Sequence, residues 1–200
     1  MMGTFANSET RENLMRAFAG ESQARNRYTI AAEQAKKQGF FVLDAVFRMT
    51  AEQEKAHAAV FYSLLGESAG QTIHIDGGYP VDIADSAAQL LRYAQHNEFE
   101  EYETVYPAFG KRAQEEGFSR AAAAFQNIAS IEKLHGERFG YFADLLEKER
   151  LFVSDVECEW MCLHCGYVYT GKEAPEVCPV CLHDRGFFVR LHLAPFSAVQ

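Results

Sequence analysis

The sequence predicts a mainly α-helical protein, in which a four-helix bundle precedes a small β and loop domain that binds a metal. The first 150 residues are rich in strong helix formers, and their apolar residues recur at spacings of three and four. The remaining residues hold every cysteine and three of the five prolines. So short a segment cannot bury a large core, and we expect a metal to stabilise it. The predicted domains are residues 1–150 and 151–200.

The four expected helices form two tight hairpins joined by a long connection. Gly39 and Gly117 mark the turns inside the hairpins, and Ser8 or Thr10 caps the first helix. The connection, residues 66–83, has about the length of a crossover that runs along a bundle. This topology is ferritin-like and differs from a simple up-and-down bundle. The expected helices span residues 8–38, 40–65, 85–116 and 118–149.

The two hairpins resemble each other at an offset of 78 residues. The repeat predicts a pseudo-two-fold axis through whatever these residues surround. The matching pairs are Gly39-Phe40 with Gly117-Phe118, Tyr28 with Tyr106, Glu54 with Glu132, and His57 with His135.

Each helix carries a glutamate at mid-length within its apolar stripe, and the second and fourth helices add a histidine three residues later. Positions i and i+3 share a helix face, so each Glu-x-x-His motif directs a carboxylate and an imidazole to one place. A buried carboxylate is costly unless it is paired or bound to a metal. Carboxylate and imidazole together suit iron or manganese, and this inventory is typical of di-iron bundles. The candidate metal ligands and catalytic residues of this group are Glu21, Glu54, His57, Glu98, Glu132 and His135.

Buried structural salt bridges are the alternative interpretation of these acids. They would need about four buried cations on matching stripes. Lys55 and Lys133 do repeat, but each directly follows its glutamate and points about 100° away from it. Arg25 has no basic counterpart in the repeat, where position 103 is Glu.

Glu101 is a seventh candidate ligand, three residues after Glu98 and without a counterpart on the first helix. We hypothesise that Glu101 binds the oxidised metal pair and that His57 is its exchange partner in the reduced state, because two ferric ions need more negative charge. The spacing from Glu98 to Tyr106 is one residue longer than its counterpart in the repeat, and Pro107 follows. This irregularity predicts a π-bulge. Tyr28 and Tyr106 are candidate hydrogen-bond donors to ligand carboxylates, or ordinary interior aromatics.

The cysteines form two CxxC motifs separated by twelve residues. Two such turns direct four thiolates to one tetrahedral site, which takes either iron or zinc. We expect a free thiol at Cys158 and exposed imidazoles at His164 and His183, whereas the other histidines, His74, His96 and His192, are structural or solvated. Strands are expected at residues 166–169 and 187–191. The candidate metal-binding thiolates are Cys162, Cys165, Cys178 and Cys181.

The overall charge and apolar pattern exclude several classes of partner. The formal net charge is −9, and no Lys/Arg cluster alternates with aromatic residues, so nucleic acid is not expected as a partner. We find no apolar run long enough for a signal peptide or a membrane span. The sequence therefore predicts a soluble, cytoplasmic protein without a membrane partner, and in that reducing compartment the cysteines fit a metal site better than disulfides.

These motifs together resemble the rubrerythrin family. The resemblance extends over residues 8–192 and implies that Glu54 and Glu132 bridge two irons, with the other five acids and histidines as terminal ligands. It further implies a rubredoxin-like iron in the tail, peroxidase activity on hydrogen peroxide in oxidative-stress defence, and a head-to-tail homodimer. The motifs are Ala19-Gly20-Glu21 with Tyr28, Glu54-x-x-His57, Glu98-x-x-Glu101 with Tyr106-Pro107, Glu132-x-x-His135, Cys162-x-x-Cys165-Gly166-Tyr167 and Cys178-Pro179-x-Cys181.

Two other functions use similar parts. One is iron oxidation and storage in a ferritin-like bundle, and the other is non-enzymatic metal binding with structural zinc in the tail. The chain has no nucleotide-binding glycine-rich loop, so we expect an external electron donor, such as an NAD(P)H-dependent reductase or a rubredoxin.

Overall fold

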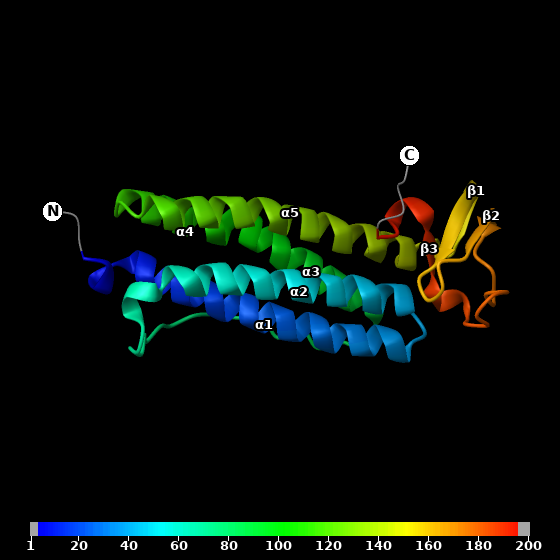
Figure 1. Cartoon of the computed structure of the whole chain (residues 1–200), viewed down its shortest axis with the longest axis horizontal. Helices are drawn as coiled ribbons and strands as arrows, with labels where there is room; N and C mark the ends of the chain where they lie inside the picture. Colours follow the sequence, from blue (N-terminus) through cyan, green and yellow to red (C-terminus); the bar gives the residue numbers. More distant parts are fainter. Residues whose placement is uncertain (1–3, 196–200) are drawn as a thin grey trace.

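A computed structural model describes residues 4–195 of the chain. Four long helical rods lie side by side, and a small β-sheet lies at one end of them (Figure 1). The third rod is interrupted, because a π-helical segment, Glu101–Val105, lies between α3 and α4. The helices are α1 (Glu9–Lys37), α2 (Phe41–Leu64), α3 (Ala87–Glu100), α4 (Tyr106–Glu115) and α5 (Ser119–Glu147).

The helix ends follow the signals in the sequence. Ser8 caps α1 by accepting a hydrogen bond from the backbone N–H of Arg11. Gly39 and Gly117 have positive φ angles of 80° and 88°, a conformation that costs glycine little, and each ends a helix at the turn of a hairpin. The helix pairs α1–α2 and α3/α4–α5 therefore form the two predicted hairpins of a ferritin-like bundle.

The long connection runs beside α1 in extended form, apart from a short 3₁₀ turn at Gly66–Ser68 (Figure 1). Side chains of α1 hold it in place. Arg16 donates to the carbonyl and the carboxylate of Asp76, and Arg27 forms an ion pair with Asp82. The third helix begins at Ala87, two residues later than predicted, after Ser86.

The π-helical segment confirms the predicted irregularity between Glu98 and Tyr106. One extra residue is accommodated in this turn, just before Pro107 in the first turn of α4. Glu98 on α3 and Tyr106 on α4 are consequently both buried, although the helical period alone would separate their faces.

The tail forms a three-stranded antiparallel sheet of order β2-β1-β3. The strands are β1 (Val153–Cys162), β2 (Val168–Glu173) and β3 (Phe188–Arg190). The predicted strands at 166–169 and 187–191 overlap β2 and β3, but β1 was not predicted. Acidic residues at alternate positions, such as Glu157 and Glu159, concealed it. In the fold these side chains are on the exposed face of β1, whereas Trp160 and Cys162 are buried.

The tail packs tightly against the end of the bundle. The Phe187 ring stacks on Phe41, at 4.0 Å between centroids and 13° between planes. Gly186 lies against the α1–α2 turn, so closely that a Cβ at this position would be 1.8 Å from the carbonyl oxygen of Gly39. Val189 of β3 belongs to the same apolar core as residues of α2 and α5. The bundle and the tail therefore share part of their core.

The last helix ends at Glu147 and the first strand begins at Val153, on either side of the predicted boundary at 150/151. The independence of the two domains stays a prediction, and their predicted outer ends, 1–3 and 196–200, lie outside the described residues. Within residues 4–195, no helix has the length and apolar character needed to cross a membrane.

The contact at Gly186 gives a stability prediction. We expect Gly186→Ala to lower the free energy of unfolding by about 1–3 kcal/mol, because the new methyl group meets backbone that cannot move aside. Chemical denaturation measures the change. Gly66→Ala is the matched control, since a Cβ there meets no atom of residues 4–195 within 4 Å. Equal stability of the two variants would contradict the tight contact.

Candidate metal centres

Six of the seven predicted carboxylates and imidazoles meet in the interior of the bundle, and all six are buried. They form two overlapping groups, in each of which one ligand atom per residue lies within 4.8 Å of the others. Glu54 and Glu132 belong to both groups, as ligands between two metal ions would. The first group adds Glu21 and His57, and the second adds Glu98 and His135.

The contacts around the two imidazoles follow the sequence repeat. His57 Nδ1 lies 2.9 Å from Glu132 Oε1, 3.2 Å from Glu54 Oε2 and 3.6 Å from Glu21 Oε2. His135 Nδ1 lies 2.9 Å from oxygens of both Glu54 and Glu132, and 3.5 Å from Glu98 Oε2. Each imidazole thus faces both shared glutamates and the glutamate of one flanking helix. This arrangement is the predicted pseudo-two-fold relation.

The cluster has more buried polar atoms than hydrogen bonds. Across residues 4–195, one oxygen each of Glu21, Glu54 and Glu98, both oxygens of Glu132 and both ring nitrogens of His135 are buried and have no hydrogen-bond partner. No Lys or Arg pairs with these glutamates in the described part of the chain, where their ion-pair partners are the two imidazoles, too few for the four buried cations that the salt-bridge alternative needs. Buried oxygens and nitrogens that lack hydrogen bonds and gather in two overlapping groups fit the donor set of a two-metal site.

Without metal, the cluster holds protons. Burial raises the pKa of Glu21 to about 8, and burial likewise raises the pKa values of Glu98 and Glu132. Burial acts in the same direction on Glu54, but the two histidines outweigh it and lower the pKa of this carboxyl to about 2. The carboxylates overcome the effect of burial on the imidazoles and raise the pKa of His57 to about 10 and that of His135 to about 11. Metal ions must displace these protons to bind.

Two buried tyrosines orient the outer glutamates. Tyr28 on α1 donates a hydrogen bond to Glu98 on α3, and Tyr106 on α4 donates one to Glu21 on α1. These bonds confirm the predicted donors. Among residues 4–195, each of these two carboxylates has no other hydrogen bond, and the crossed pattern again follows the repeat.

Glu101 is not part of the cluster. It begins the π-helical segment, is only half-buried, and lines a cavity beside α1. Its carboxylate forms no hydrogen bond or ion pair with any residue that the structure describes. Burial, followed by the charges of Glu21 and Glu98, raises its pKa well above the usual range. The structure thus places His57 in the cluster and Glu101 outside it, and the predicted exchange between them stays a prediction.

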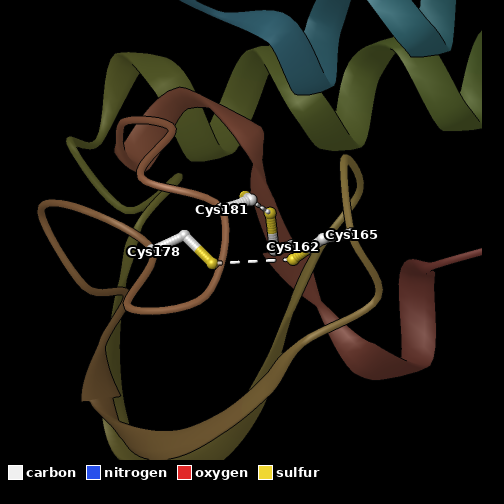
Figure 2. A group of neighbouring side chains, drawn as sticks. All are labelled: Cys162, Cys165, Cys178 and Cys181. Carbon is white, nitrogen blue, oxygen red and sulfur yellow. Dashed lines mark hydrogen bonds between the residues drawn. The ribbon is translucent and has the colours of Figure 1, made fainter.

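The four predicted cysteines converge in the tail, where their sulfur atoms turn toward one point (Figure 2). Cys162 Sγ is 3.7 Å from Cys181 Sγ, and Cys165 Sγ is 3.6 Å from Cys178 Sγ. A tetrahedral ion with bonds of about 2.3 Å to sulfur needs sulfur atoms about 3.8 Å apart, so the spacing fits a tetrathiolate metal. Cys158 lies outside this group, as a free thiol on β1.

Backbone amides and burial set the properties of the thiols. Burial raises the pKa of Cys162 to about 12, against the opposing effect of the Cys165 and His164 amides. At Cys178 the amides of Cys181 and Val180 outweigh the effect of burial and lower the pKa to about 7. Both cysteines pack in a core with Trp160 and Phe188, whereas Cys165 is exposed. One side of the site is therefore open to solvent.

The histidines near the cysteines form a small stack. His164 is exposed as predicted, but His183 is half-buried, which corrects the prediction of exposure. It stacks on His164 at 3.7 Å between centroids and packs edge-on against Phe187. His74, His96 and His192 are exposed.

The fold and the two centres define a class of protein: a ferritin-like bundle with a two-metal carboxylate site, joined to a rubredoxin-like four-cysteine module. Family models agree. The rubrerythrin model matches residues 12–142, and the model for the rubredoxin-like domain of rubrerythrin matches residues 160–189. The chain belongs to the rubrerythrin family. Its buried glutamate and histidine cluster is the di-iron site of that family, and the four cysteines are the rubredoxin-like site.

Individual relatives cover almost the whole chain. Rubrerythrin-1 of Clostridium acetobutylicum is 42% identical over 94% of this chain and 96% of its own length. The rubrerythrin of Porphyromonas gingivalis is 44% identical over 90% of this chain and 89% of its own. A structure of nigerythrin in its fully reduced, all-ferrous state is 30% identical and has a TM-score of 0.62, with 94% of this chain and 92% of that chain covered.

The protons held by the metal-free cluster give a pH prediction. The stabilising contribution of Glu21 is full below the usual pKa of 4.5 and is lost as the pH rises through about 8. The stabilising contributions of His57 and His135 are full below the usual histidine pKa of 6.5. They are lost as the pH rises through the raised pKa values, about 10 for His57 and about 11 for His135. Ferrous ions replace these protons. The rise in melting temperature on iron loading should therefore be larger at pH 8 than at pH 6, by about 5 °C.

Differential scanning calorimetry under anaerobic conditions measures this difference, with the tail loaded in all samples. Glu103→Gln, which removes an exposed acid outside the cluster, should retain the pH-dependent gain, whereas Glu132→Gln should lose most of it. An iron-induced gain that is equal at both pH values, or greater at pH 6, would rule out proton displacement from these residues.

Proposed function

We propose that the protein is a peroxidase that reduces hydrogen peroxide to water, in defence against oxidative stress, with electrons passed through the tail. The observation that carries the proposal is a four-thiolate site in the same chain as a buried two-metal carboxylate site. Iron storage needs no attached electron-transfer module, and a purely structural metal needs no cluster of unpaired acids. The cysteines of the described chain form no disulfide with one another, as expected for metal-binding thiols in a reducing compartment such as the cytoplasm.

In the proposed ligand assignment, Glu54 and Glu132 bridge the two irons. The assignment is supported by their place in both ligand groups and by the contact of each histidine with both of them. The terminal ligands would be Glu21, Glu98, Glu101, His57 and His135, and those of the tail iron Cys162, Cys165, Cys178 and Cys181.

When bound, the two ferrous ions would supply the two electrons that reduction of one peroxide molecule to two waters requires. The protein holds the ligand side chains in fixed positions for this reaction. Tyr28 and Tyr106 hold the outer carboxylates in place, and the apolar rings of Phe47, Phe61 and Phe125 fill the bundle on both sides of the cluster. Two protons are also consumed, and Glu101 is the acid of the site that faces an open cavity.

We further propose that Glu101 replaces His57 as a ligand when the metal pair is oxidised. The half-buried position of Glu101, its lack of hydrogen bonds in the described structure and its place on a π turn leave it free to move. Crystal structures of the oxidised and the reduced protein test this exchange. Glu101 is expected at the metal in the oxidised state alone, and identical ligands in both states would exclude it.

The position of the tail favours electron delivery between subunits. Phe187 contacts Phe41 at the start of α2, and Glu54 lies thirteen residues further along that helix, or about 20 Å at 1.5 Å per residue. The tail of a second chain in a head-to-tail homodimer would shorten this path. The tail would itself be reduced by an external donor, such as an NAD(P)H-dependent reductase or a rubredoxin.

Iron oxidation and storage is the second candidate, and the metal of the tail distinguishes the two. We compare protein with iron at all sites and protein with zinc in the tail and iron in the bundle. Both reduced forms should consume peroxide in a single turnover, but with a donor and excess peroxide the zinc form should be at least about tenfold slower. Equal steady-state rates would contradict the electron path, and no reaction of either form with peroxide would contradict the peroxidase.

A further inference from the structure

A cavity of about 340 Å³ lies beside α1, close to residues that contact the di-iron cluster. It is formed by α1, by the long connection between the hairpins (the crossover) near Tyr79, and by the third rod from the end of α3 through the π-helical segment to the start of α4. Its lining includes Glu101 and Tyr106, and Tyr106 donates its hydrogen bond to Glu21. A molecule in this cavity is therefore next to the one candidate ligand that the buried cluster leaves out.

One face of α1 forms the wall of the cavity, through residues spaced by four, three and four positions: Arg16, Gly20, Gln23 and Arg27. The three long side chains on this face hold the crossover, through hydrogen bonds or ion pairs to Asp76, Pro80 and Asp82. Asn97 of α3 adds a hydrogen bond of 2.6 Å to Asp82. The crossover is therefore fixed at both ends of the cavity, and the face lacks a side chain only at Gly20.

The absent side chain of Gly20 leaves a space, called the gap below, between the crossover and Glu101. A Cβ on Gly20 would be 3.7 Å from Cε1 of Tyr79 and 4.0 Å from Oε1 of Glu101. The Tyr79 hydroxyl donates to the carbonyl of Arg16 at 3.1 Å, which fixes the ring above this gap. Gly77 permits the close fit, because a Cβ there would be 3.1 Å from the same ring.

We propose that the gap at Gly20, covered by the Tyr79 ring, is the passage through which peroxide reaches the di-iron site, and that it admits hydrogen peroxide but not bulky alkyl hydroperoxides. This inference deepens the proposed peroxidase function and rests on it for the identity of the substrate. Glycine inside a helix costs about 1 kcal/mol relative to alanine. No backbone reason requires Gly20, since its φ angle is not positive, and space beside Glu101 is the feature that it provides.

Substitutions that fill the gap test the passage. Gly20→Ala adds a methyl group at ordinary contact distance, and Gly20→Leu fills the gap; both should fold, because each improves helix propensity. The expected result is a rate of oxidation by hydrogen peroxide that falls from wild type to Ala to Leu, by roughly tenfold or more for Leu. Asn26→Leu, on an exposed part of the same helix, is the matched control and should react as wild type does.

A binding measurement separates the passage from the chemistry. Azide is a small anion that binds to iron without being reduced, and its association rate follows from stopped-flow absorption. Gly20→Leu should slow azide binding as it slows peroxide, at unchanged iron content and unchanged rate of reduction of the tail. If azide binding and peroxide oxidation both proceed at the wild-type rate in Gly20→Leu, the passage lies elsewhere.

Removal of the covering ring should have the opposite effect on large substrates. Tyr79→Ala is expected to raise the rate with tert-butyl hydroperoxide relative to hydrogen peroxide by roughly tenfold, whereas Tyr79→Phe, which retains the ring, should change this ratio less. An unchanged ratio in Tyr79→Ala would overturn the selection by size. The two proposals can fail separately: slower azide binding in Gly20→Leu, together with a wild type that does not react with peroxides, would support the passage and reject the peroxidase.

Discussion

The structure depends on one physical constraint, the burial of four carboxylates and two imidazoles in the middle of a helical bundle. Such groups are costly to bury unless other charges or metal ions compensate them. The imidazoles contact the carboxylates, yet within residues 4–195 oxygens of all four glutamates have no hydrogen bond, and two imidazoles are too few to compensate four buried carboxylates, so metal ions at the centre are expected to complete the cluster. The fold is arranged to bring these groups together: each of the four rods contributes a glutamate, two tyrosines orient the outer pair, and a π turn adjusts the third rod.

The tail also depends on a bound metal for its stability. Its sheet is short, and its buried core consists of a few residues around Trp160 and Phe188, so a metal held by four thiolates supplies the missing stabilisation. The tail also uses the bundle as a support, through the close approach of Gly186 to Gly39 and the stacking of Phe187 on Phe41. These contacts keep the tail at the end of its own bundle. This geometry motivates the proposal that the tail serves the di-iron site of a second subunit.

Much of this arrangement is encoded locally and could be predicted from the sequence. The Glu-x-x-His motifs, the repeat and the extra residue before Tyr106 indicated the ligand faces and the π turn, because helical periodicity fixes which side chains share a face. Other features depend on contacts between distant residues. Nothing in the sequence links Arg27 to Asp82 or Tyr79 to Gly20. Strand β1 was not predicted, because it contains several acidic residues, whose side chains lie on the exposed face of the sheet. The sequence included Glu101 among the ligands, but only the structure separates it from the others.

The central claim is that the buried cluster holds two metal ions in one site and that the cysteines hold a third. Mössbauer spectroscopy of protein reconstituted with ⁵⁷Fe and oxidised measures this most directly. We expect two parts of a spin-coupled diferric pair to one part of high-spin ferric iron in a tetrathiolate environment. Uncoupled ferric signals alone, or a spectrum without the paired component at full iron content, would contradict it.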